Sequence, residues 1–576
     1  MKALSKILWW FIYALPAVLF FSYHPIISLG ANDSMNFELS LPLIWLLLFD
    51  LGAFVLLLIL RSHQPNQLPG ISDRRFFLLA IFPLYLTLSV FWSDNPLRGL
   101  LTAGIVWLIF FAIFAMLYIL PLTGTPRRLR THVLFVMFAS AVLVCKYCYA
   151  QSIMDILGLD RGTTLLCAGC TYRSFGFPHP SGFAIEPQFM GNLLLAPTIT
   201  ALYLVAFRSR KFANSMVSEA NYLENKVETQ VLRHQIHLPK INWNKWKVIG
   251  MTILAGFLSM TLFFTFSRGA IYAYSVALII LIIFALRHKE FRWSLITIPV
   301  VSFLFSLALQ GTFAAVGPTA ETFVSGVTKS IHQLSLGLID LRPKGTTSSV
   351  ENSTTTVENN QSNCGKDVQN SPIDCAKPVE NSTTQPSFDG YVPESTNIRL
   401  SLNQTALQTW STDPARIFFG VGLGGAGTAM HNAYPDRVTS PKEIVQHQGF
   451  SLLLETGLVG VILCIFGLLI ALAPNLFPHR FLDGRSAEAG KTGNHFWYHP
   501  VRPLLLALVI AYLITLNFFS GLPNALQIYL MPPLLYLVFQ RGALQKAIII
   551  PHSNHPSTSA KVSQRSPKSH KVPLKS

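Results

Sequence analysis

The residues best suited to chemistry in this chain lie within 399–460. A glycine-rich turn at 420–425 is followed by His431, by His447 and then by an apolar stretch that begins at Gln448. Glycine permits positive φ and lets the backbone approach a ligand closely. Histidine is the side chain whose unperturbed pKa suits a general base near neutral pH. The order therefore places ionisable groups where an apolar helix meets water.

Two arginines fall on the same, external side of the membrane as these groups in the predicted topology. Arg268 stands in a short external reversal, 265–270, between two apolar segments, and Arg399 lies early in an amphipathic helical stretch over 397–410. A cation in so short a loop can reach only the interface, so we expect Arg268 to face an anion. Guanidinium groups hold phosphate oxygens in pairs. The alternative for Arg268 is a simple interface anchor.

The elements that must position these residues are membrane helices. Hydrophobic residues make up 51% of the 576 residues, charged residues only 12%, and the mean hydropathy is +0.43. This composition predicts an all-α integral membrane protein. About 12 apolar segments are long enough to cross roughly 30 Å of hydrocarbon. They lie near 7–28, 41–60, 75–92, 97–120, 132–153, 188–207, 247–266, 269–286, 293–310, 448–473, 501–519 and 522–540.

Lys and Arg placement predicts the orientation, because positive charges near span ends are retained in the cytoplasm. Both termini are then cytoplasmic, and the net charge of +17 is mostly a topology signal. No basic soluble domain suggests nucleic acid as a partner. The basic clusters assigned to the cytoplasm lie at 61–75, 127–130, 208–247, 287–292, 480–502 and 541–576.

The predicted topology divides the chain into four parts. A membrane domain of about nine spans covers 1–310, and a large external loop covers 311–446. Within that loop, 345–396 is rich in Asn, Ser and Thr and is predicted to be disordered. A second membrane domain of about three spans covers 447–541, and a basic cytoplasmic tail covers 542–576.

Other polar residues carry weaker predictions. Asp50 and Lys146 fall within apolar segments, and we expect a structural ion pair between them, with a proton or ion pathway as the alternative. Cys167 and Cys170 form a CxxC without a second ligand pair at zinc spacing, so no metal site is expected. Cys364 and Cys375 lie on the external side, and their pairing stays open.

The region 399–460 resembles the signature region of the O-antigen ligase and polymerase superfamily of membrane glycosyltransferases, and the resemblance extends over about 170–475. It implies a GT-C-like fold in the cytoplasmic (inner) membrane and a function in bacterial cell-surface polysaccharide biosynthesis. The implied reaction is inverting transfer of a glycan from undecaprenyl pyrophosphate to a hydroxyl of a glycan or lipid-linked acceptor. It takes place at the outer face of the bilayer, without cofactor, metal or nucleotide sugar.

The resemblance also implies roles for individual residues. Arg268 and Arg399 would bind the pyrophosphate, and Gly422 and Gly424 would let the backbone approach the substrate closely. The stretch from Arg173 to Glu186 resembles the Arg…Glu-Pro element of polysaccharide polymerases, in which the carboxylate orients a basic group or the acceptor hydroxyl. From the residues alone, Glu186 and the proline after it equally suit a capped helix start.

The spacing of the histidines departs from the family pattern. Family ligases carry a histidine dipeptide, nine residues and then Gly-x-x-Gly, whereas only eight residues separate the dipeptide His447-Gln448 from Gly457. His431-Asn432 has a suitable dipeptide at a different spacing. We favour His447 over His431 as the base. Because the spacing differs from that of family ligases, a strict lipid A-core ligase is the less favoured prediction.

Two other functions stay open at this point. A multi-span transporter or flippase for a lipid-linked glycan fits the number of spans, but the two halves of the chain show no repeat of the kind expected for one. A protein O-oligosaccharyltransferase would share the same motif chemistry and differ in its acceptor.

The topology is directly testable. Cysteine or reporter tags near 230 and 560 should be cytoplasmic, and a tag near 360 should be external, because the basic clusters flank the first two positions. Topology mapping in intact cells checks this. A tag at 360 found in the cytoplasm would overturn the twelve-span arrangement.

Overall fold

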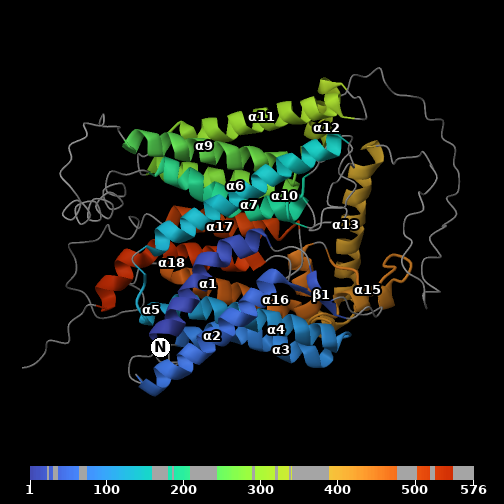
Figure 1. Cartoon of the computed structure of the whole chain (residues 1–576). Coiled ribbons are helices and arrows are strands. Elements are labelled where there is room, and N and C mark those ends of the chain that lie inside the picture. Colours follow the sequence, from blue (N-terminus) through green and yellow to red (C-terminus); the bar gives the residue numbers. More distant parts are fainter. Residues whose placement is uncertain are drawn as a thin grey trace, which may run out of the picture.

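The computed structural model is a bundle of long helices with a small hairpin and short helices at one end (Figure 1). It confirms the prediction of an all-α integral membrane protein. The structure describes residues 1–21, 25–29, 37–63, 74–126, 128–157, 180–184, 187–207, 243–287, 292–317, 322–335, 339, 388–445, 447–476, 502–518 and 526–548. The four cysteines considered above, Cys167, Cys170, Cys364 and Cys375, lie outside these residues, as does 345–387 of the predicted disordered insert. The rest of that insert, 388–396, is helical, because the helix predicted over 397–410 begins earlier, at Phe388.

Each of the predicted apolar segments contains a helix within the described residues, although 25–28, the end of the first segment, lies in a strand. Eight helices are long and apolar enough to cross a membrane: α1 (Lys2–Phe20), α2 (Leu41–His63), α4 (Pro96–Phe114, continued by the π-helical η2, Ala115–Ile119, and by α5, Leu120–Leu122), α6 (Leu129–Ile156), α7 (Pro187–Ala206), α10 (Arg268–Arg287), α11 (Ser294–Val316) and α16 (Gln448–Leu476). Shorter apolar stretches lie in α3 (Arg74–Ser89, followed by the 3-10 turn η1, Val90–Trp92), α9 (Trp243–Phe264), α17 (Arg502–Thr515) and α18 (Leu526–Ile548). The exact number of spans stays a prediction.

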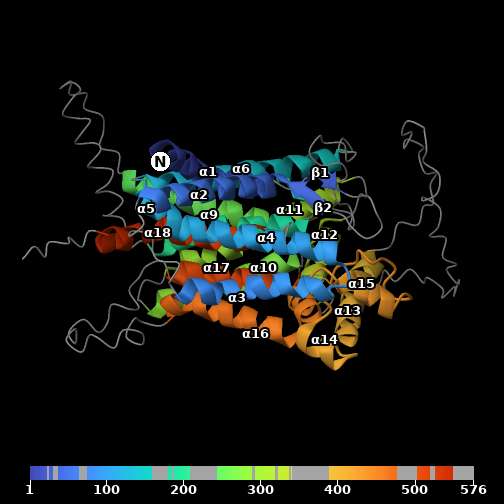
Figure 2. The ribbon, with the colours of Figure 1, turned by 90° about the horizontal axis from the view of Figure 1, so that it is seen from below.

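The remaining elements gather at one end of the bundle, which we call the loop end. The start of α1 and the end of α18 lie at the opposite end (Figures 1 and 2). In Figure 1, α13 runs across the loop end, nearly at right angles to the bundle. The loop-end elements are the antiparallel strands β1 (Pro25–Leu29) and β2 (Phe37–Ser40) and the helices α12 (Phe323–Leu334), α13 (Phe388–Trp410), α14 (Pro414–Phe419) and α15 (Ala426–Ala433).

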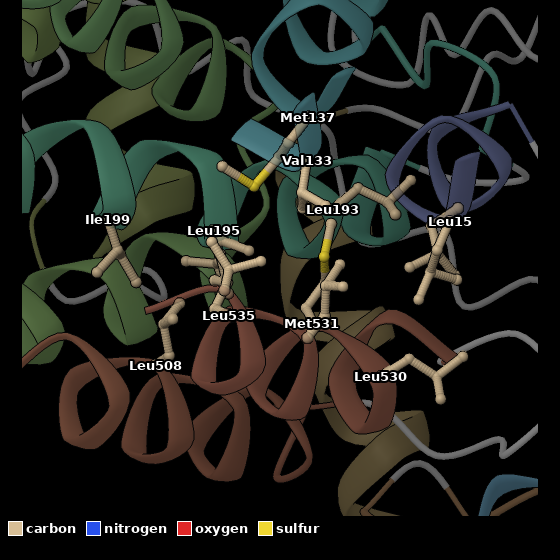
Figure 3. Packing of buried hydrophobic residues seen from close by; sticks show 14 of the residues in the cluster. Leu15, Val133, Met137, Leu193, Leu195, Ile199, Leu508, Leu530, Met531 and Leu535 are labelled. Atoms are coloured by element: carbon tan, nitrogen blue, oxygen red, sulfur yellow. The ribbon is translucent and has the colours of Figure 1, made fainter. Parts of the chain in front are cut away.

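The helix α7 forms the centre of the bundle. Its most apolar stretch is 89% buried, against 44% or less for the other seven candidate spans, as expected for a helix that is apolar on all sides. Figure 3 shows Leu193, Leu195 and Ile199 of α7 among side chains from α1, α6, α17 and α18. This burial fixes the position of the α7 start at the loop end.

The predicted ion pair between Asp50 and Lys146 is wrong. Asp50 is only 5% exposed and neither carboxylate oxygen has a hydrogen-bond partner among the described residues, whereas Lys146 lies on an exposed face of α6. The physical reason is the packing order, since α1 packs against both α2 and α6 while Lys146 lies on an exposed face of α6. The sequence of a helix, including the polar residues in it, does not show which other helix it will pack against.

The long helix α16 is broken at Gly457, which has φ 62° and ψ −169°. A break leaves carbonyl groups without their helical partners, and such groups are costly at membrane depth. Three donors satisfy them here. The N–H of Val421 donates to the Leu454 carbonyl over 2.9 Å, that of Gly422 donates to the Glu455 carbonyl over 2.9 Å, and the Tyr85 hydroxyl donates to the Thr456 carbonyl over 2.7 Å.

The same glycine-rich turn is also bonded to Ser89, the last residue of α3, and to Ser93, which follows η1. The Leu423 N–H donates to the Ser89 hydroxyl over 3.2 Å, and the Ser93 hydroxyl donates to the Leu423 carbonyl over 2.7 Å. Gly422 has φ 84°, and a Cβ there would collide with the Ser93 backbone. The turn therefore ties the break in α16 to α3 and requires glycine to do so.

Gly457→Ala should destabilise the protein, because Ala would adopt a positive φ and its Cβ would meet the Phe418 carbonyl. The expected loss is about 1–3 kcal/mol, seen as a lower midpoint of thermal unfolding in detergent. Gly467→Ala is the matched control, since Gly467 lies in the same helix with no atom near its Cβ position. An equal midpoint for Gly457→Ala and wild type would contradict the described break.

Candidate functional site

Three membrane helices begin at one point of the loop end, the turn that follows α17. The N–H of Gln448, the first residue of α16, donates to the Leu516 carbonyl over 2.9 Å. The Gln188 side chain, at the start of α7, donates through Nε2 to the Phe518 carbonyl over 3.0 Å. Gly269, at the start of α10, packs so closely on Phe518 that a Cβ would lie 2.9 Å from the Phe518 Cβ. We call this meeting point the Phe518 junction.

The Phe518 junction is suited to an anion. A helix start carries unsatisfied N–H groups and roughly half a positive charge. Such ends attract phosphate and carboxylate groups. Four helix ends meet here. The starts of α7, α10 and α16 carry positive partial charge and the end of α17 carries the opposite charge, so the three positive ends outweigh the negative one.

Arg268 is the first residue of α10 and is half-buried at this junction. The helix start is well defined, because the Ile271 N–H donates to the Ser267 carbonyl over 2.9 Å and Ser267 packs against Gly191 of α7. One turn along α10, the Tyr272 ring lies 5.8 Å from the Phe518 ring. The sequence prediction that Arg268 sits in a tight reversal at a helix end therefore agrees with its place in the fold.

His447 precedes α16 and caps it. Its Nδ1 accepts a hydrogen bond from the Phe450 N–H over 3.3 Å, and the two rings lie 4.4 Å apart. In the neutral imidazole the proton is then on Nε2. Burial lowers the pKa of His447 below its ordinary value of 6.5, so the ring stays neutral to lower pH than a free histidine.

His431 lies on α15 and has the opposite tautomer. Its Nδ1 must donate to the Val438 carbonyl, 2.7 Å away, because a carbonyl can only accept. The neutral ring therefore keeps a lone pair on Nε2. His431 is therefore fixed in place, since the residue is helical and its partner Val438 is 1% exposed.

Arg399 and both histidines belong to elements that share one apolar cluster, which we call the loop-end core. Arg399 is half-buried on α13, one turn before Leu402, which is a member of this cluster. Phe450, one turn after His447, packs against it as well. The members of the loop-end core are Leu402, Ala406, Val421, Ala426, Ala429, Met430, Val438, Val445 and Leu454. The cluster holds Arg399, His431 and His447 on one packed unit, whereas Arg268 reaches the site from the membrane helices.

Gly422 and Gly424 have a structural task in this arrangement. The Gly422 N–H is bonded to the Glu455 carbonyl, and the Glu455 carboxylate accepts hydrogen bonds from the amides of Gly424 and Ala426. Arg98 supplies a favourable charge to the same carboxylate. The amides of both glycines are thus already bonded within the protein. Sequence reasoning missed this role of Glu455, although a lone acid in an apolar run is a usable signal.

The remaining predicted site residues are not placed. Arg173 and Glu186 lie outside the described residues, which resume at Pro187. In the part of the chain that the structure describes, no group of three or more His, Cys, Asp or Glu side chains could hold a metal ion.

The helices define a multi-pass membrane protein, and one end of its bundle carries the candidate site residues Arg268, Arg399, His431 and His447. The family model described as O-antigen ligase matches residues 253–465, from α9 into α16. This match supports the O-antigen ligase and polymerase family, and the matched residues include Arg268, Arg399, His431 and His447. The family implies a glycosyltransferase-like enzyme of polysaccharide biosynthesis that uses a lipid-linked glycan at a membrane. No curated protein matches the chain.

Proposed function

We propose that this protein transfers a glycan from undecaprenyl pyrophosphate to a hydroxyl acceptor, with inversion at the anomeric carbon and without a metal ion. The observation that carries the proposal is the Phe518 junction, where three helix starts and Arg268 meet. The leaving group of this reaction is a pyrophosphate, whose negative charge grows as the glycosidic bond breaks. Fixed positive charges and dipoles stabilise such a transition state without having to reorganise.

Arg268 and Arg399 are the proposed pyrophosphate ligands. Both are half-buried, and a half-buried charge is screened less than one in open water. At an effective dielectric of about 20, two unit charges about 4 Å apart interact by roughly 4 kcal/mol. The two arginines therefore supply stabilisation that a metal ion provides in other glycosyl transfer reactions.

His447 is the proposed base for the acceptor hydroxyl, because Gln448 beside it is bonded to the Phe518 junction. To accept a proton on Nδ1, the ring must give up its 3.3 Å hydrogen bond from Phe450, which is long and therefore weak. His431 is the second candidate, since its Nε2 lone pair is already available. Arg173 and Glu186 remain proposed contributors to binding and to orientation of the acceptor.

The loop end is proposed to face the outside of the cytoplasmic membrane, with both termini in the cytoplasm. The shared position of the α1 start and the α18 end at the other end of the bundle supports this orientation (Figure 2). The proposed division is a membrane domain over 1–310, an external loop over 311–446, a second membrane domain over 447–541 and a cytoplasmic tail over 542–576.

The geometry of α16 does not favour the transporter or flippase alternative. Transporters use broken helices whose free carbonyls coordinate ions. Here the carbonyls of Leu454, Glu455 and Thr456 are all bonded to protein donors. The break therefore serves to hold the glycine-rich turn.

Deletion of the protein followed by analysis of surface glycans tests the proposed function. Shortened glycan chains would indicate a polymerase, and full-length glycan left on the lipid carrier would indicate a ligase. Full-length glycan on glycolipid with unglycosylated protein would indicate a protein O-oligosaccharyltransferase. An unchanged glycan profile would reject the proposal.

Arg268→Ala and Arg399→Ala should each abolish transfer and leave membrane insertion intact, because the charge on the leaving group is no longer stabilised. Lys at either position should restore activity only in part, since it cannot grip phosphate oxygens in pairs. Arg437→Ala is the matched control, because Arg437 is exposed at the same end and bonded to Gln408. Wild-type turnover in both Ala variants would reject the site.

His447→Ala should lower transfer by roughly 10²–10⁴-fold, the usual contribution of a general base. His447→Asn distinguishes the role of His447 as a base from its role as a helix cap. Asn is a good N-cap but cannot act as a base near neutral pH. It should keep the thermal midpoint of wild type and lose activity. Because burial lowers the pKa of His447, wild-type activity should persist below pH 6.5 and fall only when the ring becomes protonated.

The control for this pair is His431→Ala, which should affect transfer much less. Loss of activity in His431→Ala with near-normal activity in His447→Ala would assign the base to His431 and contradict our choice. Activity in both variants would mean that neither histidine is the base.

A further inference from the structure

Asn192 of α7 is a buried residue whose side-chain amide lacks a partner at both of its polar atoms. It is 1% exposed, and neither its Nδ2 nor its Oδ1 has a hydrogen-bond partner among the described residues. Nearly all buried polar side-chain atoms in proteins are bonded, and each exception calls for an explanation. A bulky apolar side chain would fill this position without the cost of burying an unbonded amide.

Asn192 lies just below the Phe518 junction. Residues four apart share one face of a helix, so Asn192 is on the face of α7 that carries Gln188, whose amide reaches the Phe518 carbonyl. It is one turn, about 5.4 Å, further into the bundle. Gly191, directly before it, packs against Ser267, the residue that precedes Arg268. The amide is therefore close to the starts of both α7 and α10.

We propose that Asn192 binds the sugar attached to the pyrophosphate of the donor, an inference that rests on the proposed function. A side-chain amide offers both a donor and an acceptor, and both are unused here. A phosphate only accepts, so it would leave Oδ1 unbonded. A sugar hydroxyl or an acetamido group both donates and accepts, and it satisfies the two atoms together. The ligand of Asn192 is the sugar ring, with the phosphates held by the helix starts and Arg268.

The test compares Asn192→Leu and Asn192→Ser in the full-length protein. Leu has the same number and branching of side-chain heavy atoms and no polar atom, so it should keep or raise the thermal midpoint while lowering transfer by roughly 10- to 100-fold, the loss of two hydrogen bonds. Ser keeps a donor and an acceptor and should restore part of the activity. Thr200→Val is the matched control, because the Thr200 hydroxyl is equally buried and unbonded among the described residues but lies two turns deeper in α7.

Binding of bare undecaprenyl pyrophosphate, which carries no sugar, separates this inference from the proposed function. Wild type and Asn192→Leu should bind it equally, and Arg268→Ala should not. Failure of wild type to bind would overturn the proposed function and this inference with it. Normal wild-type binding with full transfer by Asn192→Leu would overturn this inference alone, as would loss of carrier binding in Asn192→Leu.

Discussion

The loop end depends on the break in α16 at Gly457 and on the glycine-rich turn that caps it. The carbonyls of Leu454, Glu455 and Thr456 at the break accept hydrogen bonds from Val421, Gly422 and Tyr85, which removes the cost of leaving them unbonded at membrane depth. The glycine-rich turn also contributes to the loop-end core, together with parts of α13, α15 and α16. One backbone constraint thus holds the segment before Gly457 as a separate short helix. Its start carries His447 and reaches the Phe518 junction.

The Phe518 junction combines two sources of positive charge that differ in kind. Helix starts provide fixed dipoles at no conformational cost, and Arg268 adds a full charge on a flexible stem. A lipid-linked pyrophosphate suits such a place, because its charged part sits at the membrane boundary while its chain remains among the helices. The sugar then points toward residues that can bond hydroxyl groups. We propose that in this arrangement Asn192 and the histidines bind the glycan and the acceptor, and that the arginines bind the leaving group.

The sequence predicted those features that depend on local pattern. Apolar length located the membrane helices, and the position of Arg268 between two apolar segments placed it correctly at a helix start. Features that depend on which segments pack against each other were not predicted. The predicted ion pair between Asp50 and Lys146 was wrong because the sequences of the two helices do not show how the helices pack. The GxGxG pattern suggested substrate contact, whereas the structure bonds the amides of Gly422 and Gly424 to Glu455. The unbonded amide of Asn192 became visible only when burial was known.

A structure of the protein bound to undecaprenyl pyrophosphate, determined by electron cryo-microscopy in a lipid nanodisc, tests the central claim most directly. The account predicts pyrophosphate density at the Phe518 junction, between the starts of α7, α10 and α16 and within reach of the Arg268 guanidinium. Density for the pyrophosphate at the opposite end of the bundle, or at the loop end but away from these three helix starts, would contradict it.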